Sequence, residues 1–105
     1  MARFDVYRNP AATAESTPYL LDIQSDWLDG LDTRVVVPLR RLDHFATVKL
    51  PERLTPTFVI ESVHCMLETP KLASVPARLL RDKVINLSDH REVVTQALDF
   101  LLQGY

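Results

Sequence analysis

The sequence predicts a mainly β domain, a small barrel or sandwich closed by one C-terminal helix. Three observations predict it. Short runs with strand character recur along the chain, and one apolar run with helical spacing comes at its end. The length of 105 residues suits one domain, which we expect to span 1–105, without internal repeats.

Three strands are expected in the first part of the chain, from period-two alternation or valine content: Arg3–Tyr7, Tyr19–Gln24 and Thr33–Leu39. Residues 8–18 are small and polar with a proline near each end, which predicts a loop. Residues 25–32 contain Asp29 followed by Gly30, which predicts a turn. Pro38 predicts that the third strand ends there or lies at an edge.

The second part of the chain predicts further short strands: Thr55–Ser62, Val63–Thr69, a run ending at Val75, and Lys83–Leu87. The first two form an expected hairpin through Glu61 and Ser62, and Pro76 stands where a helical turn begins. Residues 40–54 have weak periodicity, so a short helical turn and irregular chain both remain open.

Residues 88–105 predict the terminal helix. Asp89 and Glu92 have the spacing of a capping box at its start. The expected apolar face is Val94, Ala97, Leu98, Leu101, Leu102 and Tyr105, and the expected polar face is Thr95, Gln96, Asp99 and Gln103.

Composition excludes several classes of protein. A net charge of −2 and a pI of about 5.8 argue against a protein that binds duplex nucleic acid directly, because phosphate binding normally needs a basic face. The single cysteine excludes an intramolecular disulfide and fits a reducing compartment. No signal peptide and no membrane-spanning apolar run are expected, so the sequence favours a cytoplasmic protein.

No catalytic or metal-binding set emerges from the residues. His64 and Cys65 are neighbours on an expected strand and point to opposite faces, so Cys65 is expected in the core. The three histidines lack metal-ligand spacing. Asp22, Asp26, Asp29 and Asp32 lack the spacing of a calcium loop, so we expect a solvated turn with capping carboxylates. The chain is therefore not expected to be an enzyme or to need a cofactor.

Trp27 is the only tryptophan and stands in the turn-rich stretch beside Leu28. Exposed tryptophan often anchors a protein interface. The alternative is a ring that plugs the core beneath the turn, and the sequence leaves both interpretations open.

Several ungapped blocks carry a family resemblance: "DIQSDWLD", "TRVVVPL", "MLETPKLASVP", and "LSDHRE" before a helix that ends in glycine plus one residue. In this order they resemble the CcdB family, the toxins of plasmid and chromosomal addiction modules. The resemblance covers essentially the whole chain, with a longer loop at Asn9–Pro18.

The resemblance implies an SH3-like small barrel with a C-terminal helix, a fold shared with the ribonuclease toxins MazF and Kid. It implies a homodimer that binds the A subunit of DNA gyrase, traps gyrase on cleaved DNA and catalyses nothing. It also implies a CcdA-type antitoxin. DNA would be met only through the gyrase complex or the toxin–antitoxin repressor complex.

The resemblance also implies which residues bind gyrase: Trp27, Leu28, Asp99, Leu102, Gln103, Gly104 and Tyr105. Trp27 and Leu28 stand where the family has two isoleucines. At the chain end the family typically has Trp-Gly-Ile, so Gln103 replaces the tryptophan, Gly104 is kept and Tyr105 replaces the isoleucine.

Two other functions remain open beside gyrase poisoning. One is an mRNA endonuclease of the MazF or Kid kind, which needs an arginine and an acid or base converging on a basic groove. The other is a homologue that binds antitoxin without poisoning gyrase. We expect the dimer contact near Leu72, Ala73 and the C-terminal helix, and the antitoxin contact to reach Asn9–Pro18.

Overall fold

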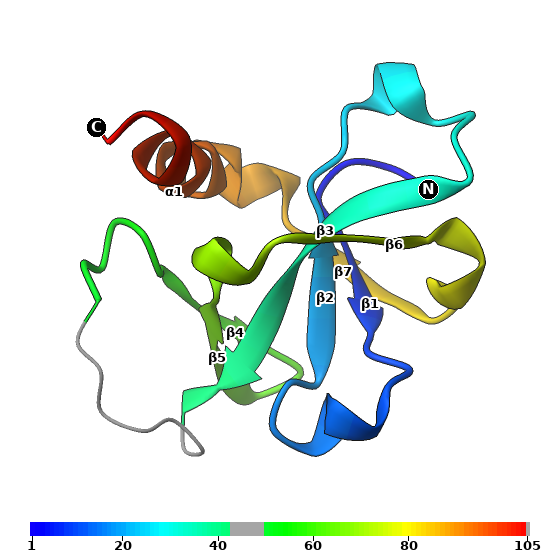
Figure 1. The fold of residues 1–105 in the computed structure, drawn as a ribbon. Helices are drawn as coiled ribbons and strands as arrows, with labels where there is room; N and C mark the ends of the chain where they lie inside the picture. Colours follow the sequence, from blue (N-terminus) through cyan, green and yellow to red (C-terminus); the bar gives the residue numbers. More distant parts are fainter. Residues whose placement is uncertain (43–49, 105) are drawn as a thin grey trace.

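The computed structural model describes residues 1–42 and 50–104, in which seven antiparallel strands form one curled sheet (Figure 1). The strands are β1 (Asp5–Arg8), β2 (Tyr19–Asp22), β3 (Thr33–Arg41), β4 (Thr57–Ile60), β5 (Val63–Leu67), β6 (Ala73–Pro76) and β7 (Lys83–Asn86). The α-helix α1 (Arg91–Gln103) follows the last strand. The prediction of a mainly β fold, a small SH3-like barrel with a C-terminal helix, is confirmed.

Strand β3 organises the sheet. Its neighbours follow the order β4-β5-β3-β2-β1-β7, and β6 pairs with β3 as well. The first half of β3, from Thr33 to Val36, pairs with β6, and its last residues, from Leu39 to Arg41, pair with β5. The strand therefore changes neighbour on one side while β2 stays paired on the other.

The prediction that Pro38 ends β3 or marks an edge is wrong. Pro38 lies inside the strand, opposite Leu20 of β2, and its carbonyl oxygen accepts the Glu68 N–H at 2.9 Å. Glu68 follows β5 and precedes β6, so Pro38 faces the gap between these two neighbours. A missing N–H costs no ladder hydrogen bond at that gap.

The predicted hairpin of β4 and β5 is confirmed, with Glu61 and Ser62 at its turn. Both residues have positive φ, 50° and 64°, as a type I′ turn requires. The Glu61 carboxylate accepts two hydrogen bonds of 2.7 Å from the Arg8 guanidinium and one of 2.6 Å from the Tyr19 hydroxyl. These bonds hold a backbone conformation that neither residue type favours.

Strand β1 begins two residues later than predicted, because Phe4 has φ of 73° and so interrupts the extended backbone. Phe4 is nevertheless bonded on both sides. Its N–H donates to the Asp22 carbonyl at 2.7 Å, and its carbonyl accepts the Leu87 N–H at 2.8 Å.

The C-terminal helix is confirmed, but its predicted start is wrong. A 3₁₀ turn (Ser88–His90) precedes α1, and neither Asp89 nor His90 caps the helix with its side chain. The Ser88 N–H instead donates to the Asn86 side-chain oxygen at 2.8 Å. No capping box forms.

The buried face of α1 is narrower than predicted. Val94 and Ala97 are fully buried, whereas Leu98 and Leu101 are only partly buried. Leu102, which we expected on the apolar face, is 73% exposed. Truncating Leu98 or Leu101 should therefore cost less than truncating a fully enclosed leucine.

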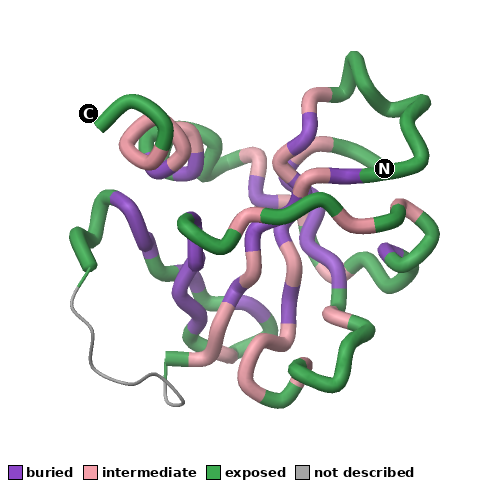
Figure 2. Tube along the Cα trace, in the orientation of Figure 1, coloured by how far each residue is buried: buried purple, intermediate pink, exposed green. Residues whose placement is uncertain are grey.

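The core lies on the concave side of the sheet and beneath α1 (Figure 2). The main cluster contains Val6, Leu21, Val37, Leu39, Ile60, Cys65, Leu67 and Val94, all essentially inaccessible to solvent. A smaller cluster gathers around Tyr7, Val36 and Leu80. Cys65 is buried while His64 is exposed, as strand alternation predicted.

The two buried tyrosines give a pH prediction. Burial, and then the Asp5 carboxylate, raises the pKa of Tyr7 to about 12. Burial, and then the bond to Glu61, raises the pKa of Tyr19 to about 12 as well.

Both pKa values lie above the ordinary value of 10.0, so the folded state holds these protons more tightly than the unfolded state. The stability that they contribute is complete below pH 10 and is lost as the pH rises towards 12. An ultraviolet titration of a Tyr105→Phe variant should show both remaining phenols ionising near pH 12, with circular dichroism reporting the fold. Ionisation of both near pH 10 in a chain that is still folded would contradict the structure.

Candidate functional site

The turn between β2 and β3 presents the most exposed large apolar side chain of the described residues. A short 3₁₀ helix, η2 (Asp26–Leu28), forms its centre. Trp27 is 96% exposed and Leu28 is 49% exposed, and Leu31 is exposed beside them. Of the two interpretations that the sequence left open for Trp27, the exposed ring is therefore correct, and a ring that plugs the core beneath the turn is wrong.

Local hydrogen bonds fix the backbone of this turn. The Ser25 hydroxyl accepts the Trp27 N–H at 3.2 Å, and the Leu28 N–H donates to the Ser25 carbonyl at 3.0 Å. The Asp26 carboxylate accepts the Arg3 N–H at 2.8 Å, which joins the turn to the N-terminal segment. The Trp27 ring is thus exposed on a backbone that is held on both sides.

Gln24 supports the turn from below, and both its main-chain and side-chain groups are bonded. Its side-chain N–H donates to the Leu28 carbonyl at 2.9 Å, and its side-chain oxygen accepts the Val35 N–H at 3.0 Å. Its main-chain N–H donates to Asp22 at 3.0 Å. One nearly buried side chain therefore joins the turn to strand β3.

Under Gln24 lies a fully buried ion pair. The Arg34 guanidinium donates to the Asp22 carboxylate at 2.8 Å, and the side chains of both residues are 0% exposed. The guanidinium also meets the Asp29 carboxylate at 3.3 Å. The expectation that all four aspartates lie in a solvated turn is wrong for Asp22, because Arg34 enters the core beside it.

Burial and ion pairing shift the pKa of each partner in opposite directions. Burial raises the pKa of Asp22, and the hydrogen bonds from Arg34 and Gln24 oppose that rise without cancelling it. For Arg34, burial lowers the pKa, but Asp22, Asp29 and Tyr7 together outweigh burial and the net pKa is raised. The guanidinium therefore stays charged, and it binds the turn to the core through Asp29.

The last turn of α1 brings three of the other expected site residues together. Asp99, Leu102 and Gln103 stand three and four residues apart, so they share one face. Leu102 and Gln103 are exposed there. Gly104 ends the helix with φ of 82°, and its N–H donates to the Phe100 carbonyl at 2.9 Å. Tyr105 lies outside the described residues.

The structure does not bring all the expected residues into one site. The η2 turn and the C-terminal end of α1 lie at opposite ends of the molecule (Figure 1). One protomer thus has two separate candidate surfaces, the turn surface (Trp27, Leu28 and Leu31) and the helix-end surface (Asp99, Leu102, Gln103 and Gly104).

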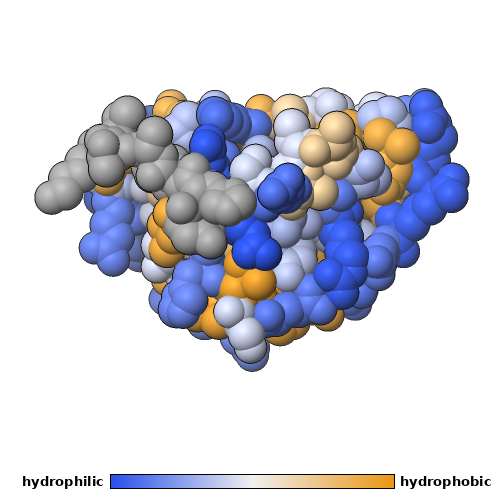
Figure 3. Space-filling model, turned by 90° about the horizontal axis from the view of Figure 1, so that it is seen from below, coloured by the Kyte–Doolittle hydropathy of each residue, from blue (hydrophilic) through white to orange (hydrophobic). Residues whose placement is uncertain are grey.

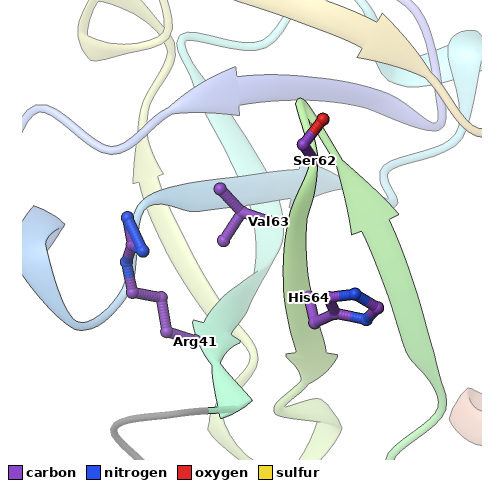
Figure 4. Close-up of a pocket in the computed structure, with 4 residues that line it drawn as sticks. All are labelled: Arg41, Ser62, Val63 and His64. Carbon is purple, nitrogen blue, oxygen red and sulfur yellow. The ribbon is translucent and has the colours of Figure 1, made fainter.

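A hollow of about 230 Å³ is lined by Arg41, Ser62, Val63 and His64. Arg41 and His64 nevertheless lie on opposite sides of strand β5 (Figure 4). They do not converge on one point, as the endonuclease alternative would need. Among residues 1–42 and 50–104, no group of histidine, cysteine and acidic side chains is placed to hold a metal ion.

The face at the bottom of Figure 1 is mainly hydrophilic where its residues are described, with separate apolar patches (Figure 3). The Asn9–Pro18 loop contains a 3₁₀ turn (Ala12–Glu15), and its side chains are exposed or half-buried. The Asn9 side chain orders this loop by donating to the Thr17 carbonyl at 2.8 Å and accepting the Ala11 N–H at 3.0 Å.

Near the expected dimer contact, Leu72 is half-buried against the core and Ala73 is exposed. The 3₁₀ turn before them (Thr69–Lys71) packs against α1, so these residues and the helix form one continuous region. No helix in the described part of the chain is both long and apolar enough to cross a membrane.

Comparison with known proteins agrees with this architecture. A family model described as CcdB protein matches residues 3–104, which is nearly the whole chain. A search of curated proteins found no match. The chain belongs to the CcdB family and is a toxin of a toxin–antitoxin pair.

Proposed function

We propose that this toxin binds the A subunit of DNA gyrase in the cytoplasm and traps gyrase on cleaved DNA, and that a CcdA-type antitoxin neutralises it. The observation that carries the proposal is Trp27, 96% exposed on a turn that the core holds in place. Rigid, exposed aromatic side chains are the residues that most often dominate protein interfaces. In this proposal the toxin acts by binding alone, and no residue is assigned a catalytic role.

The turn surface supplies an aromatic ring that the helix end lacks at position 103. The family's terminal tryptophan is replaced by Gln103, whereas an isoleucine of the family is replaced by Trp27. An exposed aromatic ring therefore remains available for gyrase, at another place on the protomer. Leu28 extends this surface, and Asp99, Leu102, Gln103, Gly104 and Tyr105 form the second contact.

We also propose a homodimer through the region of Leu72, Ala73 and α1. A chain of this size buries only about two-thirds of its unfolded surface, so a dimer contact adds stability. A two-fold dimer would present the turn surface and the helix-end surface twice. The antitoxin, a segment that folds on binding, would reach the Asn9–Pro18 loop.

The dimer predicts the mass of the toxin in solution. Sedimentation equilibrium at micromolar concentration should give twice the chain mass of 12.0 kDa. An Ala73→Arg variant should shift the population towards the monomer, because a charge would enter the interface, while the exposed Ala12→Arg substitution should not. A single 12.0 kDa species for the unmodified chain would contradict the dimer.

The gyrase proposal predicts that changes at the two surfaces weaken gyrase binding without lowering the stability of the fold. Deleting residues 103–105 removes the last helical residue and the exposed end, so the melting temperature should change little. Trp27→Ala should also leave the melt unchanged, since the ring is 96% exposed. Each change should weaken gyrase trapping, measured as cleaved plasmid in a supercoiling assay, and killing of gyrase-sensitive cells.

Val94→Ala serves as the opposite control, because Val94 is fully buried and its truncation should lower the melting temperature. Undiminished gyrase trapping in both surface variants would contradict the proposed surfaces. Cleavage of RNA by the unmodified chain, without effect on gyrase, would favour the endonuclease alternative. Antitoxin binding without either activity would favour a homologue that no longer poisons.

A further inference from the structure

We propose that the tip of the β4–β5 hairpin, Val59–His64, is a lid over the core that opens without unfolding the rest of the protein. An exposed clasp, formed by Arg8 with Glu61 and Asp82, holds this lid closed. The lid lies beside the start of β2, whereas the turn surface follows the end of that strand (Figure 1). The inference does not depend on the identity of the toxin's target.

Main-chain pairing attaches the lid to the rest of the sheet only at its base. Strand β5 pairs with β3 through its last three residues, Cys65 to Leu67, and β4 is a terminal strand of the sheet. Among the described strands, the lid residues pair only across the hairpin, as Ile60 does with Val63. The lid can therefore move as a unit without breaking a ladder with another strand.

The clasp uses all three nitrogens of one guanidinium. The Nη1 and Nη2 atoms of Arg8 each donate to a different oxygen of the Glu61 carboxylate at 2.7 Å. The Nε atom of Arg8 lies 2.9 Å from a carboxylate oxygen of Asp82, which directly precedes β7. Strands β4 and β7 are the two ends of the strand order, so one side chain from β1 ties both ends of the sheet together.

The clasp is exposed, so its closure is reversible. The side chains of Arg8, Glu61 and Asp82 are 48%, 39% and 65% accessible to solvent. Exposed ion pairs contribute little to stability and are screened by salt. The Tyr19 hydroxyl donates a further bond of 2.6 Å to Glu61, and no other side chain of the described residues bonds to this carboxylate.

The turn of the lid stores backbone strain. Glu61 and Ser62 have φ of 50° and 64°, in the left-handed region that glycine and asparagine adopt more readily than glutamate and serine do. The clasp holds Glu61 in this conformation through its side chain. When the clasp releases, the turn relaxes towards negative φ, and this relaxation favours the open lid.

The lid covers apolar core. Ile60 is 1% exposed and belongs to the main core cluster, and Val63 packs against that cluster. A hollow of about 230 Å³ already lies beside the lid, lined by Arg41 and three lid residues. Opening would enlarge this hollow with apolar walls and bring solvent to Cys65, which is fully buried next to the lid on β5.

The test uses Cys65 as the reporter of opening, because it is the only cysteine and is 0% exposed in the closed structure. The full chain is labelled with an uncharged thiol reagent, and hydrogen exchange of the α1 amides reports global unfolding in parallel. Raising the salt concentration from about 0.1 M to about 1 M should speed labelling roughly threefold to tenfold without speeding α1 exchange. Labelling that is independent of salt, or that follows α1 exchange, would overturn the proposal.

Charge variants assign the effect to the clasp. Glu61→Gln should speed labelling at low salt roughly threefold to tenfold, and added salt should then have little further effect. The matched control Glu52→Gln removes the charge of an exposed carboxylate outside the clasp and should leave the labelling rate unchanged. Equal labelling rates in these two variants would contradict the lid.

Two more variants separate the strain of the turn from the clasp. Ser62→Gly relieves one positive φ and keeps the clasp, so it should slow labelling roughly threefold. Arg8→Gln combined with Glu61→Gln should label at the rate of Arg8→Gln alone, because both residues act through one clasp. Faster labelling of Ser62→Gly, or a double variant in which the two single effects multiply, would refute the proposed mechanism.

Discussion

The buried ion pair of Arg34 and Asp22 is the interaction on which the functional end of the molecule depends. Both side chains are inaccessible to solvent, and their atoms are 2.8 Å apart. Burying a charge is costly unless it is paired and hydrogen-bonded, and removing one partner of such a pair typically costs about 3–5 kcal/mol. The pair therefore constrains β2, which carries Asp22, and β3, which carries Arg34, at the place where the turn between them begins.

From this pair a chain of hydrogen bonds runs outward to the exposed ring. Gln24 joins Asp22 to the Leu28 carbonyl and to the Val35 N–H, and Arg34 adds a contact to Asp29. Trp27 therefore gains a fixed position without being buried. Interface and stability are separated in this arrangement, because the buried residues hold the turn while the exposed ring contributes almost nothing to the core.

A second polar cluster stabilises the other end of the sheet. Glu61 bonds to Arg8 and Tyr19, and these bonds, of Arg8 first and Tyr19 second, lower the pKa of Glu61. The folded state therefore favours the carboxylate, and this stabilisation is lost as the pH falls through the lowered pKa. This cluster is exposed, whereas the Arg34–Asp22 pair that supports the turn surface is buried.

The sequence predicted the types of the elements better than it predicted where Pro38 and the charged side chain of Asp22 lie. Alternation and valine content predicted the strands, and helical spacing predicted α1, because these patterns reflect burial directly. Pro38 was misplaced because its tolerance depends on the gap between β5 and β6, which no local pattern shows. Asp22 was placed in solvent because its partner stands twelve residues away.

The exposed position of Trp27 was one of two open interpretations, and Gln24 was assigned only to a strand. A signal for the buried pair was present, since Arg34 interrupts an apolar strand with a residue that is almost never fully buried unless it is paired. The family resemblance supplied the seven expected site residues, but it did not show that the six described ones form two separate surfaces of one protomer.

Hydrogen exchange of the turn amides tests most directly whether the buried network fixes the turn surface. In the unmodified chain, the Leu28, Asp29 and Leu31 amides should be protected by their bonds to the Ser25, Asp26 and Leu28 carbonyls. In a Gln24→Met variant that protection should fall, while the amides that pair β2 with β3 between Tyr19 and Leu39 keep theirs. Turn amides that exchange at the same rate in both proteins would contradict the account.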